Sequence, residues 1–256
     1  MLTGMLDRER LPPLAALAGV TLLAWIYLVL FSSRVMPMDM DAMGMAMAPA
    51  PWTVAEALSM FLMWAVMMVG MMLPSAAPMI LLYDELGKKA RAEGHGFAGA
   101  GWFAGGYLLA WTGFAALATA AEFFLERAAL ISVKGLAATP VLASIPFLAF
   151  ALYQFTPFKQ TCLAQCRGPL AFIQRHGGFR ARPAGALGLG LRHGLYCIGC
   201  CWAVMALLFA FGVMNLIWVA ALALFVLAEK LLPWGVWIGR ISGLAGLVAG
   251  LVLLLR

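Results

Sequence analysis

Long apolar runs recur through this chain, and they constrain its fold more than any other feature. A hydrocarbon layer roughly 30 Å thick is crossed by about 20 apolar residues in a helix, and inside it only helices or closed barrels satisfy their backbone hydrogen bonds. The runs are continuous, which favours helices. The sequence therefore predicts an all-α, polytopic transmembrane helix bundle with about seven spans, at about residues 14–31, 53–82, 98–125, 139–158, 187–213, 215–232 and 236–255.

The composition excludes an ordinary water-soluble domain. Of the 256 residues, 64% are hydrophobic and only 11% are charged, whereas a soluble domain carries about 25% charged residues. We expect two parts: an N-terminal anchor helix with an outer Met-rich loop in residues 1–52, and a helical membrane domain with ligand-rich spans in residues 53–256. The first apolar run is long and lacks a small-residue cleavage site directly after it, so it is interpreted as a retained anchor and not as a signal peptide.

The basic residues predict an orientation. Lys and Arg are retained in cytoplasmic loops, and with the N-terminus inside, all of them except Arg34, Arg127, Lys134 and Arg256 fall in inner segments. The sequence therefore predicts a multi-pass protein of the inner (cytoplasmic) membrane with a cytoplasmic N-terminus. This asymmetry accounts for most of the net charge of +6, so no nucleic-acid partner is expected.

The predicted outer loop is rich in methionine. Thioether sulfur is a soft, neutral ligand that favours Cu(I) and needs no deprotonation. The alternative is a loop that lies on the lipid surface, with Met as an adaptable apolar residue. The methionines of this loop are Met36, Met38, Met40, Met43, Met45 and Met47.

The second predicted span continues the pattern. Met60, Met63, Met67 and Met71 recur at three- and four-residue spacing on one helical stripe, and Met68 and Met72 extend it on the adjacent face. These residues are candidate metal ligands, but methionines at helical spacing are also typical of simple core packing.

All five cysteines fall near the predicted cytoplasmic ends of the fourth and fifth spans. In a helix, Cys162 and Cys166 share one face. Thiols stay reduced in the cytoplasm and bind Cu(I) more strongly than thioethers do. The alternatives are small apolar residues that fill helix interfaces, or a reversible disulfide. On the fifth span, the residues that share one helical stripe are His193, Cys197, Cys201 and Met205, with Cys200 alongside.

Charged residues also occur in or near the spans. Glu122 and Glu126 are expected to face the bundle interior, because exposure to lipid is costly. Glu229 and Lys230 most simply mark the inner end of a helix, with Lys230 as an anchor.

Several motifs resemble, in order, a bacterial family of metal-binding integral membrane proteins. The resemblance covers roughly residues 53–232 and implies metal binding, without fixing the metal or the direction of transfer. The outer Met-rich loop lies outside it. The matching segments are 63–74, 153–167, 197–202, Met214-Asn215 and Glu229-Lys230.

These observations lead to one functional hypothesis and two alternatives. The leading hypothesis is a Cu(I)-binding inner-membrane protein that gathers copper on outer methionines and delivers it to the inner cysteines. Its expected partners are a metal ion and the lipid bilayer, with a copper chaperone or a metalloenzyme as a candidate protein partner. The alternatives are a membrane thiol-disulfide redox protein and a scaffold for metal insertion. We expect metal transport or delivery more than catalysis, because the sequence has no recognisable catalytic motif.

Overall fold

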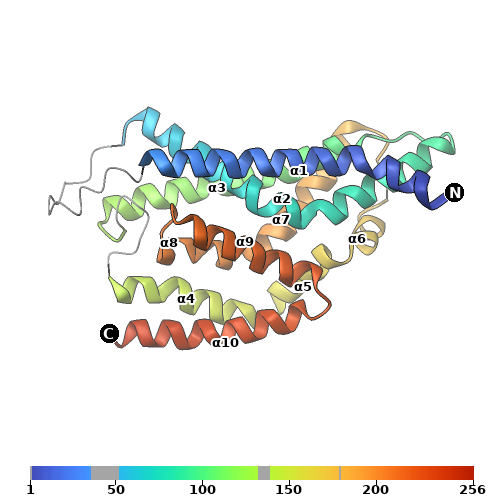
Figure 1. The fold of residues 1–256 in the computed structure, drawn as a ribbon. Coiled ribbons are helices and arrows are strands. Elements are labelled where there is room, and N and C mark those ends of the chain that lie inside the picture. The colour runs from blue at the N-terminus through green and yellow to red at the C-terminus, as the bar shows by residue number, and fades with distance from the viewer. Residues whose placement is uncertain (1, 36–51, 132–138, 179) are drawn as a thin grey trace.

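Helices form all the regular structure of residues 2–35, 52–131, 139–178 and 180–256, which are the residues that the computed structural model describes; within them there is no β-strand (Figure 1). The predicted all-α bundle is therefore confirmed. The helices are α1 (Leu2–Val35), α2 (Val54–Ala92), α3 (Ala100–Arg127), α4 (Pro140–Gln154), α5 (Pro157–Arg167), α6 (Pro169–Arg175), α7 (Pro183–Ala206), α8 (Leu208–Phe211), α9 (Leu216–Leu231) and α10 (Gly235–Leu254).

Five helical segments are long and apolar enough to cross a membrane. They lie in α1, α2, α3, α7 with α8, and α10, and the bent pair α4 and α5 can count as a sixth. The remaining predicted span is α9, which is helical but has only 16 residues. Each of the seven predicted segments is thus largely helical, although α9 falls short of an 18-residue span.

The fourth predicted span, residues 139–158, is not one straight helix. α4 ends at Gln154, and α5 begins at Pro157 after a bend of 72°. A residue before proline disfavours the helical backbone, while proline suits the first turn of a new helix. Thr156 caps that turn, since its hydroxyl accepts a hydrogen bond of 3.3 Å from the Lys159 amide. Cys162 and Cys166 therefore lie on a separate short helix.

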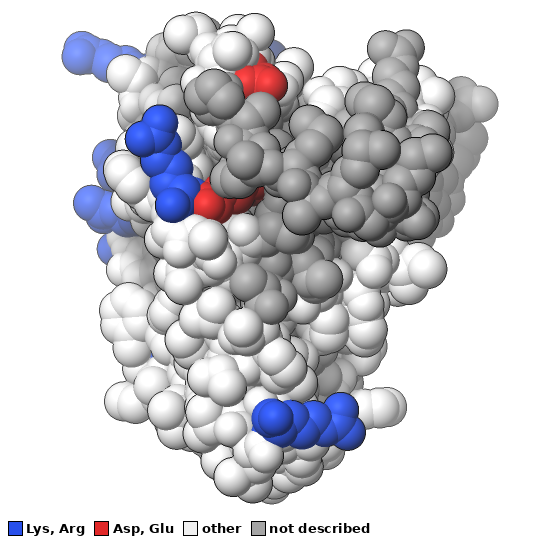
Figure 2. Space-filling model, turned by 90° about the vertical axis from the view of Figure 1, so that its left-hand side faces the viewer, with Lys and Arg blue, Asp and Glu red and all other residues white. Residues whose placement is uncertain are grey.

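Successive long helices run alternately between the two ends of the bundle, and the chain termini lie at opposite ends (Figure 1). The end of α2, its connection to α3, helix α6 and the residues before α7 lie at the N-terminal end. The basic residues there are Lys88, Lys89, Arg91, Arg175, Arg180 and Arg182. Figure 2 views the opposite end, where α3 ends at Arg127 and Arg256 follows α10. The asymmetry in charge seen in the sequence is therefore also an asymmetry between the two ends of the folded bundle.

Glycines bring α3 and α7 unusually close together. A Cβ atom on Gly106 would collide with the Leu187 backbone, and one on Gly190 would collide with the Phe103 backbone. Small residues at such positions allow two helix backbones to approach closely. This contact fixes the register in which Tyr107 of α3 lies beside Cys197 of α7.

A buried polar network joins α5 to the end of α9. Lys159 forms an ion pair with Glu229 and also donates to the Gln154 side chain. The Arg167 guanidinium donates to the backbone carbonyls of Leu232 at 2.8 Å and Pro233 at 3.0 Å. These contacts hold the cysteine-bearing helix α5 against the bundle.

Candidate metal centre

Side chains from five helices meet around Cys197 in the interior of the bundle. Their polar and sulfur atoms are in contact, although they come from distant parts of the sequence. They are Met72 and Ser75 of α2, Tyr107 of α3, Cys166 of α5, Cys197, Cys200 and Cys201 of α7, and Lys230 of α9. We call the sulfur atoms of Met72, Cys166, Cys197, Cys200 and Cys201 the sulfur cluster.

Cys197 is the centre of this arrangement. Its sulfur accepts a hydrogen bond of 2.8 Å from the Lys230 ammonium group. The Tyr107 hydroxyl lies 3.0 Å from the same sulfur and donates to the Met72 carbonyl oxygen at 3.1 Å. Cys197 is 1% exposed, so both contacts form away from solvent.

The other sulfur atoms surround Cys197. The thiols of Cys200 and Cys201 donate to the Cys197 carbonyl oxygen at 3.1 Å and 2.9 Å. The sulfurs of Cys166 and Cys200 are 3.9 Å apart, and those of Cys201 and Met72 are 4.0 Å apart. Thiols of one helix are thus joined to a thiol of α5 and a thioether of α2.

These separations suit a soft metal ion. A thiolate sulfur lies about 2.3 Å from a bound metal, so two of three sulfurs spread in a plane around one ion are about 4 Å apart. Among the described residues, no three His, Cys, Asp or Glu side chains are already arranged around a single point as ligands. The closest approach to such a site is therefore made by two pairs of sulfur atoms, Cys166 with Cys200 and Cys201 with Met72. Soft sulfur donors of this kind select Cu(I).

The predicted stripe on α7 exists. His193, Cys197, Cys201 and Met205 are all buried, as their four-residue spacing indicates. The His193 ring lies among the aromatic rings of Phe103, Tyr107 and Phe172. Its Nδ1 atom has no hydrogen-bond partner in the part of the chain that the structure describes.

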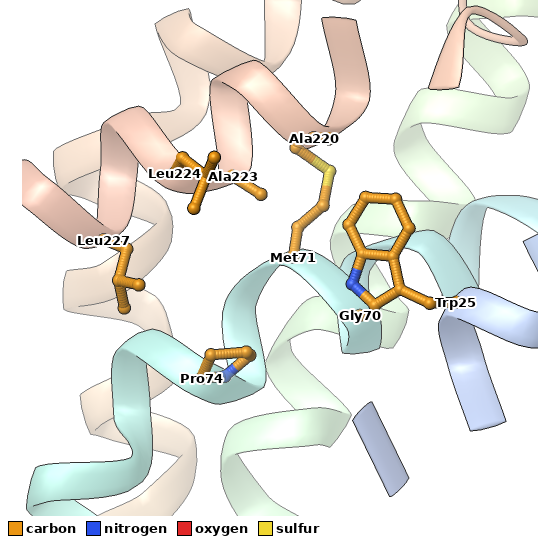
Figure 3. Close-up of a pocket in the computed structure, with 8 residues that line it drawn as sticks. All are labelled: Trp25, Gly70, Met71, Pro74, Ala220, Ala223, Leu224 and Leu227. Atoms are coloured by element: carbon orange, nitrogen blue, oxygen red, sulfur yellow. The ribbon is translucent and has the colours of Figure 1, made fainter. Parts of the chain in front are cut away.

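The methionines of α2 are buried, but they occupy different places. The buried core that holds the α7 cysteines also contains Met63, Met67, Met68, Met71 and Met72, and Met72 reaches Cys201. Met71 also points toward α9 at a cavity of about 300 Å³, which is lined mainly by apolar side chains of α1, α2 and α9 (Figure 3).

The location predicted for the cysteines needs correction. Cys197, Cys200 and Cys201 lie in the second half of α7 and are buried in the bundle, instead of lying near the start of the helix at Pro183. Cys166 is partly exposed, in contrast to the other four. Cys162 faces Gly199 of α7, but no hydrogen bond within the described residues joins it to the sulfur cluster.

The six methionines of residues 36–47 lie outside the described residues.

Sequence reasoning missed Tyr107, Ser75 and Lys230. Lys230 was expected to anchor a helix end, but it is 5% exposed and contacts Ser75 and Cys197. Its position beside a long apolar run was a usable signal, because an ionisable residue inside a span is a candidate functional group. Tyr107 and Ser75 carried no comparable signal in the sequence.

The comparisons with known proteins bear on this centre. A family model for PpoB2, described as a copper chaperone, matches residues 61–253. The chain belongs to this copper chaperone family. The matched region contains all the described residues of the sulfur cluster, together with Lys230. Neither the curated proteins nor the solved structures include a match.

Proposed function

We propose that this copper chaperone is an integral membrane protein that binds Cu(I) as cargo at the sulfur cluster and passes it to a partner. The observation that carries the proposal is the convergence of Met72, Cys166 and the three α7 cysteines in the interior of the bundle. Membership of a copper chaperone family supports delivery over catalysis. The apolar helices support a membrane location.

The ligand chemistry favours Cu(I) over harder ions. Thiolate and thioether ligands select Cu(I), while carboxylates and waters suit harder ions. The carboxylates of Glu122 and Glu229 are held elsewhere: Glu122 accepts a hydrogen bond of 2.6 Å from the Trp64 indole, and Glu229 pairs with Lys159. The cluster therefore offers an ion almost only sulfur.

A route for copper follows from the order of the ligands. The buried methionines of α2 lead to Met72, and Met72 lies against Cys201. Copper would pass from weaker thioethers to stronger thiolates, which corresponds to transfer from the outer Met-rich loop toward the cytoplasm. Cys166 is the partly exposed cysteine, so it is the ligand that a partner reaches first.

The test is the copper content of the whole protein purified anaerobically in detergent. We expect wild type to retain copper and the double variant Cys197→Ser/Cys201→Ser to lose most of it, measured by elemental mass spectrometry. Cys162→Ser is the matched control, since Cys162 is a buried cysteine with no hydrogen bond to the cluster in the described part of the chain. Equal copper in wild type and the double variant would contradict the proposal.

One observation favours a second candidate function. The thiols of Cys166 and Cys200 are 3.9 Å apart, and all five cysteines are free, so a reversible disulfide between α5 and α7 is a thiol-disulfide alternative. Labelling of free thiols in the same preparations, before and after a mild oxidant, separates the two functions. Copper-free protein that loses two reactive thiols on oxidation would favour the redox function.

A further inference from the structure

Lys230 is a buried cation that has no carboxylate partner among the described residues. It is 5% exposed, and its ammonium group donates to the Ser75 hydroxyl at 3.1 Å and to the Cys197 sulfur at 2.8 Å. The neighbouring carboxylate, Glu229, forms its ion pair with Lys159. A buried charge without a counter-charge is strongly unfavourable.

The contacts of Lys230 place its ammonium group beside the proposed metal ligands. Among the described residues, it donates to the Ser75 hydroxyl and to the Cys197 sulfur, and the Tyr107 hydroxyl lies 3.0 Å from the same sulfur. A cation bound at Cys197 would therefore lie close to a buried ammonium group.

We infer that Lys230 makes the sulfur cluster select monovalent soft cations over divalent ones. This inference rests on the proposed function and concerns the charge of its site. A cation held by the Cys197 sulfur lies close to the buried Lys230 ammonium group, and like charges repel strongly in a low-dielectric interior. This repulsion is about twice as large for a divalent ion as for a monovalent ion at the same position.

The charge of Lys230 separates selection from simple packing. A lysine that only filled space would be replaceable by methionine, which has a similar length and no charge. Loss of the ammonium group removes a repulsion that opposes divalent ions more than monovalent ions, so the selectivity for monovalent ions falls. Lys230 is therefore a specificity-determining residue that acts on the metal through charge and not as a ligand.

The experiment uses Ag(I) and Cd(II) as probes. These ions have the same number of electrons and both favour sulfur, but they differ in charge. Any difference in preferred coordination geometry is common to wild type and variants, so the change in the ratio between them reports the effect of Lys230. The full-length protein, reduced and in detergent, is equilibrated with both ions, and the bound ratio is measured by elemental mass spectrometry. For Lys230→Met we expect the ratio of Ag(I) to Cd(II) to fall at least roughly tenfold, and for Lys230→Arg to stay close to wild type.

The outcomes distinguish the inference from the proposed function. Wild type that binds Ag(I), with an unchanged ratio in a folded Lys230→Met variant, would overturn the inference and leave the proposed function intact. Wild type that binds neither copper nor Ag(I) would overturn both. Lys230→Gln provides the second neutral variant, since its amide can still donate to Ser75, and it must lower the ratio in the same direction.

Discussion

Met72 joins two sets of ligands that are far apart in the sequence. Its thioether lies 4.0 Å from the Cys201 sulfur, and its carbonyl oxygen accepts a hydrogen bond from Tyr107. Only the first contact depends on the side chain of Met72, so substitution at this position isolates the contribution of the thioether.

Replacement of Met72 by leucine tests this role. Met72→Leu conserves volume and should cost less than about 1.5 kcal/mol of stability, but it removes one sulfur donor. We expect Cu(I) affinity to fall roughly tenfold, measured by competition with a Cu(I) chelator. Met79→Leu is the control, because Met79 is a buried methionine of the same helix that lies outside the sulfur cluster. An equal effect of both substitutions would assign the loss to packing.

Individual residues show what a sequence can and cannot predict about such a site. The stripe of His193, Cys197 and Cys201 follows from the periodicity of one helix, so it could be predicted. The contact of Lys230 with Cys197 depends on how α9 packs against α7, and no local pattern encodes that packing. Cys166 could be proposed as a ligand from the sequence, but its specific contact with the Cys200 sulfur could not be predicted.

At the level of elements, the interface between α3 and α7 depends on glycine. The backbone carbonyl of Phe103 occupies the space that a Cβ atom on Gly190 would need, and Gly106 is in the same situation at the Leu187 backbone. Neither helix can carry a side chain at these points without moving away from the other. The position of Cys197 relative to Tyr107 depends on this approach.

Gly190→Ala is therefore expected to destabilise the protein by about 1–3 kcal/mol, as overpacking of a close contact does. Gly188→Ala on the same helix is the matched control, since a Cβ atom there would meet no atom of the described residues within 4 Å. The measurement is thermal unfolding of both variants in the same detergent. A Gly190→Ala variant as stable as the control would mean that α3 and α7 do not approach so closely.

The break between α4 and α5 shows how far an element could be predicted. The apolar pattern correctly indicated a helix, but it continued past Gln154 and hid the bend. Pro157 was a visible signal for a new helix start. The angle of the bend could not be predicted, because it depends on the contacts of α5 with α7 and α9, including the Lys159–Glu229 ion pair.

For the whole molecule, the sequence predicted the class of fold and the distribution of charge, because both depend on composition along the chain. It did not predict which helices surround the cysteines. The two termini lie at opposite ends of the bundle, which is the arrangement expected for the seven predicted spans. The basic N-terminal end is the end that we propose to be cytoplasmic.

Epitope tags test this orientation. One tag inserted in the connection between α2 and α3, next to Gly94, should be protected in intact spheroplasts, and one attached after Arg256 should be accessible to antibody. Both tags should become accessible after the membrane is permeabilised. Accessibility of the Gly94 tag alone would reverse the orientation, and the same accessibility for both would contradict an odd number of passes.

If the sulfur cluster holds Cu(I) as we propose, its depth also governs how quickly the ion can leave. Cys197, Cys200 and Cys201 are each 1% exposed, so a chelator in solution cannot touch an ion held among them until helices separate. Separation of the helices is then the slow step, and the rate of copper release reaches a maximum that a higher chelator concentration does not increase. We expect a partner that engages α5 at Cys166 to remove copper faster than this limit, so that the encounter with the recipient sets the residence time of copper.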